Sequence, residues 1–232
     1  MIRLGLIVLC LVPGASSVAR GEQPALPVVG CKTADAQTSS SAGDWRLPRD
    51  LPKTTAAPRG LTLRQRTRLV TYTGILRVNR NFQLIGPRGW NCGAVLAQDG
   101  NWTMTLAPPS KTPHETIEMD GFWGYQAVGE ACPYFQAARR AYDQPALCRP
   151  PVRIQTVVRG PHLATVTTRS SGRVSSLPKI GYVLWYPKTR ALAQTILGAC
   201  TVGPETRDLC STVLSDARSR QQMALERLAR PR

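Results

Sequence analysis

Six cysteines outside the N-terminal segment constrain the fold of this chain more than any other feature of its sequence. The seventh, Cys10, lies in an apolar run, Leu4–Val12, that follows a short positive start and ends at a Pro-Gly pair. Small residues up to Ala19 complete the pattern of a secretory signal peptide, so we expect cleavage after Ala19. The apolar run is too short to cross a hydrocarbon core, which needs about 20 residues. We find no later transmembrane segment in the sequence.

The six remaining cysteines form an even set, which predicts three disulfide bonds in an exported chain. Short loops close most easily, so cysteines that are near in sequence are the favoured partners, although other connectivities stay open. The expected pairs are Cys132–Cys148, Cys200–Cys210 and, from the cysteines left over, Cys31–Cys92. The cysteines lack the spacing of a zinc site, and neither histidine lies near a cysteine pair. We therefore expect no metal and no cofactor.

A lipid anchor at Cys31 is an alternative to the disulfide. The segment VVGC that ends at Cys31 loosely resembles a bacterial lipobox. In a lipoprotein the apolar run leads directly into that box, whereas Arg20 and Glu22 intervene here. We therefore favour the disulfide over lipidation.

The chain divides into an expected signal peptide at 1–19, a flexible linker at 20–60 and a single secreted domain at 61–232. The linker segment has few large apolar residues and many Ser, Thr, Ala and Pro. Such a segment buries too little surface to offset the entropy lost on ordering it.

β-Branched runs and turn signals predict an antiparallel sheet within the domain. Strands are expected at 69–78, 94–97, 102–106, 153–158, 163–168, 180–186 and 191–197, and helices at 133–142 and 204–230. An Asp-Gly step predicts a hairpin between the second and third of these strands, and the last two are expected to form another. We therefore predict an α+β fold: a mostly antiparallel sheet with a short middle helix and a long C-terminal helix, stapled by disulfides.

Arginine gives the chain a formal net charge of +16, from 30 basic against 14 acidic side chains. Such a field attracts polyanions, for example phospholipid headgroups or wall phosphates. Arg64, Arg66 and Arg68 alternate, so in an extended segment they would share one face, and they are the candidate binding residues. A solvated surface is the alternative interpretation. No helix-turn-helix, zinc-finger or RNP pattern is present, so we expect no sequence-specific nucleic-acid partner.

The search for catalytic motifs leaves one acidic segment. The sequence contains no esterase elbow, dinucleotide fingerprint or P-loop. Glu118 and Asp120 would share one face of a strand, where a hydrolase can use an acid pair, and nearby His114 is a further base or ligand candidate. An exposed loop that leads into a plain strand is the alternative interpretation.

Aromatic residues cluster in the middle of the chain, at Trp90, Trp102, Trp123 and Tyr125. Exposed rings of this kind stack on sugars. Burial in the core is the commoner role and therefore the competing interpretation.

A block around Cys92 resembles a known pattern. Residues 86–94 read GPRGWNCGA, and Ala131-Cys132-Pro133 follows later. This arrangement resembles secreted actinobacterial proteins of unknown function with a Gly-Pro-x-Gly-Trp-x-Cys block. The resemblance implies export and disulfides, and it carries over no catalytic residue.

Two hypotheses for function follow from the sequence. The first is a secreted, non-enzymatic, envelope-associated protein, extracellular or bound to the cell wall, whose partner is an anionic envelope component or another protein. The alternative is an extracellular hydrolase of a cell-wall or other polymer. A cleft that holds the acids would favour the hydrolase, and a basic face would favour binding.

Overall fold

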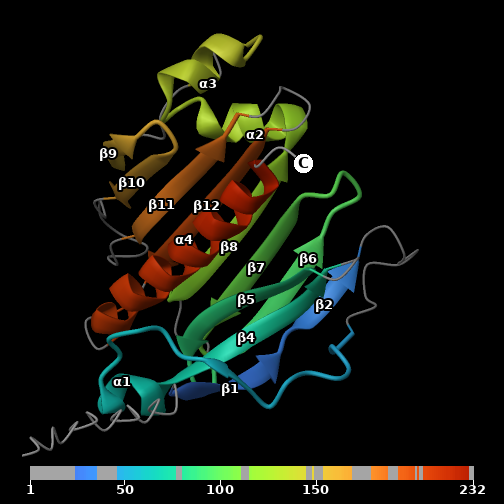
Figure 1. Cartoon of the computed structure of the whole chain (residues 1–232), viewed down its shortest axis with the longest axis vertical. Coiled ribbons are helices and arrows are strands. Elements are labelled where there is room, and N and C mark those ends of the chain that lie inside the picture. The colour runs from blue at the N-terminus through green and yellow to red at the C-terminus, as the bar shows by residue number, and fades with distance from the viewer. Residues whose placement is uncertain are drawn as a thin grey trace, which may run out of the picture.

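The computed structural model has a large sheet at its centre, with helices and a smaller sheet packed on it (Figure 1). It describes residues 24–35, 46–76, 80–110, 115–144, 148, 154–168, 179–187, 193–201, 203 and 206–229. The predicted signal peptide and His114 lie outside the described residues. The predicted α+β class is confirmed, with mostly antiparallel sheets and a long C-terminal helix.

The large sheet contains eight strands in the order β2-β6-β7-β8-β12-β11-β10-β9. Their bounds are β2 Lys32–Asp35, β6 Asn91–Leu96, β7 Trp102–Ala107, β8 Thr116–Trp123, β9 Ile154–Gly160, β10 Leu163–Thr168, β11 Lys179–Tyr186 and β12 Gln194–Thr201. Neighbours are antiparallel except β2 and β6, which are parallel. Both predicted hairpins, β6–β7 and β11–β12, are present.

The smaller sheet contains four strands in the order β3-β1-β4-β5. Their bounds are β1 Ala25–Gly30, β3 Thr54–Ala56, β4 Leu69–Leu76 and β5 Arg80–Pro87. The first strand runs parallel to β4 and antiparallel to β3. Residues near the N-terminus therefore form part of the folded body.

The prediction of a flexible linker over 20–60 is wrong where the structure describes that segment. The segment turns at Cys31 from β1 in one sheet to β2 in the other, so it bridges the two sheets. Leu26 and Cys31 are fully buried. Backbone pairing with distant strands and a disulfide order this segment, although its own composition is poor in large apolar residues.

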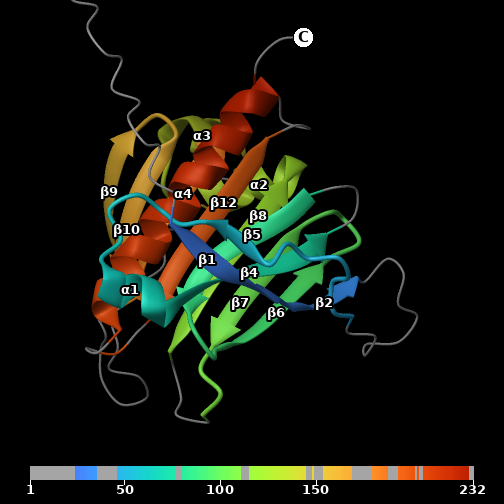
Figure 2. The same cartoon turned by 60° about the horizontal axis from the view of Figure 1, so that its bottom comes forward.

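One face of the eight-stranded sheet, the inner face, packs on the smaller sheet and on α4 (Arg207–Ala229). Figure 2 shows α4 and the smaller sheet side by side over this face. Met104, Ile117 and Met119 project into this core from β7 and β8, and Leu209 meets them from α4. Gly121 is required here, because a Cβ at that position would overlap the indole ring of Trp102 on β7.

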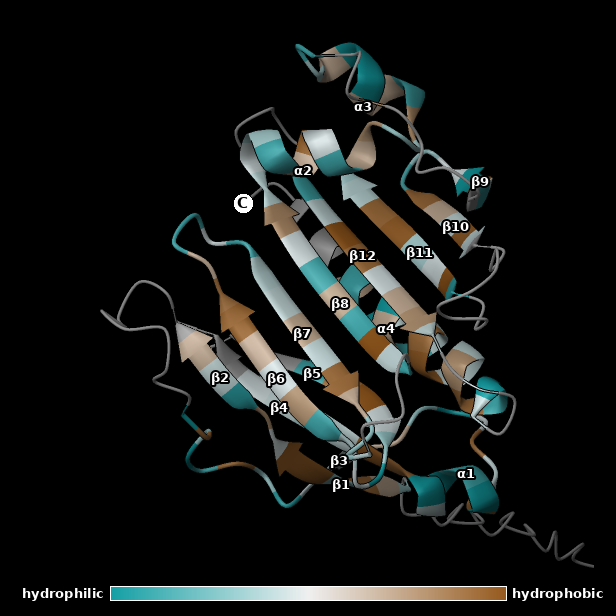
Figure 3. Cartoon of the chain, turned by 180° about the vertical axis from the view of Figure 1, so that it is seen from behind, coloured by the Kyte–Doolittle hydropathy of each residue, from teal (hydrophilic) through white to brown (hydrophobic). Residues whose placement is uncertain are grey.

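Among the described residues, helices cover the opposite, outer face at one end. Two short helices, α2 (Gly124–Ala131) and α3 (Gln136–Ala141), lie across that end (Figure 3). Ala131 and Phe135 pack there against Val183 and Trp185 of β11. The helix α3 falls within the predicted 133–142 helix. The sequence did not predict α2, which contains two glycines and has no side-chain N-cap.

All three predicted disulfide pairings are confirmed. The Cα–Cα separations are 4.7 Å for Cys31–Cys92, 5.3 Å for Cys132–Cys148 and 5.9 Å for Cys200–Cys210. Cys31–Cys92 joins the residue between β1 and β2 to β6. Cys132–Cys148 joins the end of α2 to the segment after α3, and Cys200–Cys210 joins β12 to α4. Each bond therefore fixes a place where the chain leaves a sheet or a helix.

Candidate functional site

The three predicted binding arginines lie on a helix, so the expectation of an extended segment is wrong. The helix α1 (Leu63–Arg68) begins with a capping box in which Thr62 and Gln65 bond each other's backbone N–H groups. Side chains on a helix turn by about 100° per residue, so Arg64 and Arg68 share a side and Arg66 does not. The Arg66 guanidinium donates to the Leu61 carbonyl at 3.1 and 3.0 Å. Arg66 therefore closes the helix start.

A turn after β5 brings a further arginine to the end of α1. The backbone N–H of Arg88 donates to the Arg68 carbonyl at 2.8 Å, and its Nε donates to the Thr67 carbonyl at 3.2 Å. Arg88 is exposed. The strands β4 and β5 lie between α1 and this turn, and their antiparallel pairing brings the two basic positions together.

The Arg88 turn is fixed from inside by a buried tyrosine. The Tyr72 hydroxyl lies 2.7 Å from the Pro87 carbonyl and 3.0 Å from the Trp90 carbonyl. Burial raises the pKa of Tyr72, while the Trp90 hydrogen bond and the nearby Arg88 charge lower it, with a net upward shift. The hydroxyl thus stays protonated and keeps donating to the turn. Gly89 completes the turn at φ +82°, a conformation that favours glycine.

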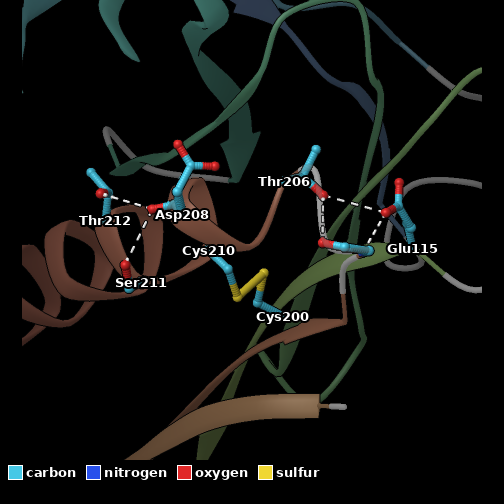
Figure 4. The surroundings of a disulfide bond; sticks show 8 residues. Glu115, Cys200, Thr206, Asp208, Cys210, Ser211 and Thr212 are labelled. Atoms are coloured by element: carbon cyan, nitrogen blue, oxygen red, sulfur yellow. Dashed lines mark hydrogen bonds between the residues drawn. A yellow bond between two sulfur atoms is a disulfide. The ribbon is translucent and has the colours of Figure 1, made fainter. Parts of the chain in front are cut away.

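The start of α4 adds another arginine at the same place. Figure 4 shows the Cys200–Cys210 disulfide between β12 and the first turns of α4, with Asp208 beside it. Asp208 pairs with Arg68 at 3.6 Å, and exposed Arg207 is its neighbour in sequence. The Thr206 hydroxyl and the Gly203 N–H donate to Glu115, which further anchors this start.

These arginines form one patch, here named the basic end. Its members are Arg64, Arg68, Arg88 and Arg207. They come from α1, from the turn after β5 and from the start of α4. Asp208 is the acidic partner that the contacts place among them.

The predicted acid pair lies on the outer face of β8. Glu118 and Asp120 alternate with buried Ile117 and Met119, as expected for neighbours two apart on a strand. Glu118 is paired with Lys179 of β11 at 3.1 Å. His114, the third residue of that hypothesis, lies outside the described residues.

Asp120 has a second acidic neighbour that the sequence did not reveal. Burial raises the pKa of Asp120, a Thr103 hydrogen bond lowers it, and the Glu118 charge raises it further. Burial also raises the pKa of Glu130 on α2, and the charge of Asp120 adds to that rise. The sheet and α2 thus bring Asp120 and Glu130 close enough for each to disfavour ionisation of the other.

An open cleft of about 640 Å³ lies beside Glu130, at the end of the molecule that carries α2. Its lining residues come from the β6–β7 turn, α2 and the segments around α3: Asp99, Asn101, Trp123, Tyr125, Gln126, Gly129, Glu130, Pro133 and Tyr142. We name it the acidic cleft. Two of the lining residues are carboxylates, and no Lys or Arg belongs to the lining that the structure describes.

A nearly buried asparagine fixes the shape of the acidic cleft. Asn101 is 7% exposed. Its Oδ1 accepts from the Trp123 N–H at 2.9 Å, and its Nδ2 donates to Asp99 at 2.7 Å and to Gln126. One side chain therefore ties the β6–β7 turn to the first turn of α2.

The described residues contain no group of three or more His, Cys, Asp and Glu side chains placed to hold a metal ion. Among the helices in the described ranges, none combines the length and apolarity needed to span a membrane. Comparison with known proteins found no matching family model, curated protein or solved structure.

The sequence alone did not reveal the helix α1 or the roles of Arg88, Arg207 and Glu130. The Thr62-x-x-Gln65 pattern is a capping-box signal that predicts the start of α1. Arg88 and Arg207 carry no local signal, because only strand pairing and helix packing bring them to α1. Glu130 lies on α2, a helix that forms because Ala127 and Val128 pack on the sheet.

Proposed function

We propose that this chain is an exported, non-enzymatic, envelope-associated protein that binds an anionic surface through its basic end. The observation that carries the proposal is the convergence of Arg64, Arg88 and Arg207, three exposed arginines from separate parts of the chain. Net charge alone gives diffuse attraction, whereas a fixed cluster gives a docking position. The three disulfides support export, because such bonds persist in oxidising compartments.

An exposed leucine favours a lipid surface over a dissolved polyanion. Leu63, the first residue of α1, is 75% exposed and directly precedes Arg64. An apolar side chain beside arginines suits the boundary between headgroups and acyl chains. Arginine also matches phosphate, because its planar guanidinium makes paired hydrogen bonds. We therefore propose anionic phospholipid headgroups as the ligand of the basic end.

The test is vesicle co-sedimentation with matched charge-reversal variants. The first variant changes Arg64, Arg88 and Arg207 to Glu. The control changes Arg139, Arg140 and Arg159 to Glu, which alters net charge equally at exposed positions on α3 and β9. On vesicles of phosphatidylglycerol and phosphatidylcholine, the first variant should lose about a hundredfold in affinity, since each arginine near such a surface contributes about 1 kcal/mol.

The control variant should lose much less than the first. Equal losses of vesicle affinity in the two variants would mean that net charge attracts the protein diffusely and that the basic end is not a binding site. If the parent protein binds heparin but not the vesicles, the ligand of the basic end is a dissolved polyanion and the proposed lipid ligand is wrong.

A second candidate function is hydrolysis of an envelope polymer, favoured by the neighbouring carboxyl groups of Asp120 and Glu130. A carboxyl whose pKa is raised holds the proton that a general acid must deliver. The test is release of soluble fragments from purified cell wall by the protein and by Asp120→Asn and Glu130→Gln. The hydrolase function is supported if the parent protein releases fragments and both variants do not. It is contradicted if the parent protein releases none.

A further inference from the structure

The acidic cleft presents aromatic rings beside hydrogen-bonding groups. Trp123, Tyr125 and Tyr142 supply the rings, and Tyr125 is 43% exposed. The ring centres of Tyr125 and Tyr142 lie 5.0 Å apart, tilted by 38°. Rings held in this way offer flat apolar surface on the cleft wall. Such surface suits the C–H faces of a sugar ring.

The polar lining of the cleft includes two carboxyl groups and two amides. Asp99 and Gln126 are exposed, and Glu130 is half-buried. Carboxylate and amide oxygens accept hydrogen bonds from hydroxyl groups, and the Gln126 amide also donates. Ligand sites usually combine an apolar wall with a few such polar groups in a cavity of this size.

The charge of the lining selects against anions. The protein as a whole is strongly basic, yet the described lining has two carboxylates and no cationic side chain. An anionic ligand would have to approach both Asp99 and Glu130. The ligand of this cleft is therefore neutral or cationic, in contrast to the ligand of the basic end.

The geometry favours a neutral ligand over a cation. A cage for an ammonium group needs aromatic faces that surround the charge together with an ionised carboxylate. Here the cleft is open, and Glu130 holds its proton more readily than an ordinary glutamate. A hydroxyl-rich ligand needs no ionic partner, because the carboxyl and amide groups of the lining both form hydrogen bonds with hydroxyl groups.

The cleft is also fixed before any ligand arrives. Asn101 connects Asp99, Trp123 and Gln126 by hydrogen bonds. The Cys132–Cys148 disulfide holds the other side, next to Pro133. A preformed site loses less freedom on binding, which favours weakly held ligands such as saccharides.

We propose that the acidic cleft is a second binding site that takes a short neutral saccharide, stacked on Tyr125 and Trp123 and hydrogen-bonded by Asp99, Gln126 and Glu130. This site lies at the opposite end of the molecule from α1 (Figure 1). It does not depend on the proposed binding of an anionic surface.

The test is titration calorimetry with four neutral trisaccharides: N,N′,N″-triacetylchitotriose, cellotriose, maltotriose and mannotriose. At least one should bind with a Kd of about 1 mM or lower. Tyr125→Ala should weaken that binding about tenfold or more, and Tyr125→Phe should retain most of it because the ring remains. The matched control is Val157→Ala, an exposed side chain on β9 that should leave the affinity unchanged.

Three results would overturn the proposal. The first is no binding by any of the four saccharides. The second is binding that Tyr125→Ala and Val157→Ala affect equally, which would locate the ligand elsewhere. The third is tighter binding of benzyltrimethylammonium than of every saccharide, which would assign the cleft to cations. The triple variant at Arg64, Arg88 and Arg207 should bind the saccharide normally, so failure of this site and failure of the basic end are distinguishable.

Discussion

The two ends of the molecule differ in charge and in how they are built. The basic end has arginines on α1, on the turn after β5 and at the start of α4, and it protrudes into solvent. The acidic cleft is concave, and aromatic rings and carboxylates line it. A net charge of +16 therefore says little about the local charge of any one site on the surface. Fold topology, which gathers residues from distant segments, sets the local charge.

The two ends share one structural device. Each is fixed by a disulfide and by one buried polar side chain that bonds a turn: Tyr72 at the basic end and Asn101 at the acidic cleft. The central sheet separates them. We therefore expect a local change to affect the ligand of one end and to leave the other end intact.

The largest expected effect is the loss of a disulfide. Replacing both Cys200 and Cys210 by Ala should lower the free energy of unfolding by about 3 kcal/mol, because the unfolded chain regains the freedom of a closed loop. Replacing both Cys132 and Cys148 should cost a similar amount. Urea denaturation measures both. At temperatures where both variants remain folded, the first should weaken vesicle binding only and the second saccharide binding only.

The next effect concerns the asparagine of the cleft. Asn101→Ala should lower the free energy of unfolding by about 2 kcal/mol, because the Trp123 N–H loses its acceptor in a nearly buried place. Exposed Asn91, at the start of β6, is the matched control, and its replacement should cost less than about 0.5 kcal/mol. Equal costs would mean that Asn101 does not hold the turn.

A smaller effect is expected at the basic end. Tyr72→Phe should lower the free energy of unfolding by about 1 kcal/mol, because the hydroxyl no longer bonds the carbonyls of the Arg88 turn. The control is Tyr182→Phe, a similarly buried tyrosine whose hydroxyl donates to the Met119 sulfur at 3.9 Å. Sulfur is a weak acceptor, so this change should cost less. Thermal unfolding of the parent and of the two variants measures which substitution lowers stability more. A larger loss for Tyr182→Phe would contradict the role given to the Tyr72 hydroxyl.

The smallest effect is a pH dependence of stability at the cleft. The pKa values of Asp120 and Glu130 are raised in the folded protein, mainly by burial. The folded state therefore holds these protons more tightly than the unfolded state, and stability falls as pH rises from the ordinary carboxyl range, about pH 4, toward neutral. Glu130→Gln should make this fall shallower in urea denaturation at several pH values. A steeper fall would contradict the inferred shift.

The sequence allowed much of the fold to be predicted, for local reasons. The strand over β10 matches its prediction residue for residue, since a β-branched run between turns forms a strand in almost any context. Short loops predict the Cys132–Cys148 and Cys200–Cys210 disulfides, and the even number of cysteines then leaves Cys31–Cys92. The long periodicity of α4 likewise predicts its extent closely.

The features that could not be predicted from the sequence depend on contacts between distant segments of the chain. Leu26 and Cys31 are ordered by strands that follow much later in the chain. Glu130 meets Asp120 only because α2 folds back over the end of β8. The predicted pair of Glu118 and Asp120 does share a face, but Lys179 engages Glu118, and Asp120 also lies near Glu130 of α2.

Hydrogen–deuterium exchange on the vesicle-bound protein tests whether the basic end and the acidic cleft bind their ligands separately. Binding to phosphatidylglycerol vesicles should slow exchange in peptides that cover 62–68 and 87–90, and leave peptides that cover 123–142 unchanged. Adding a saccharide that binds the cleft should then slow exchange in 123–142 while the protein stays on the vesicles. Vesicle protection centred on 123–142, or release of the protein by the saccharide, would contradict two separate ends with ligands of different charge.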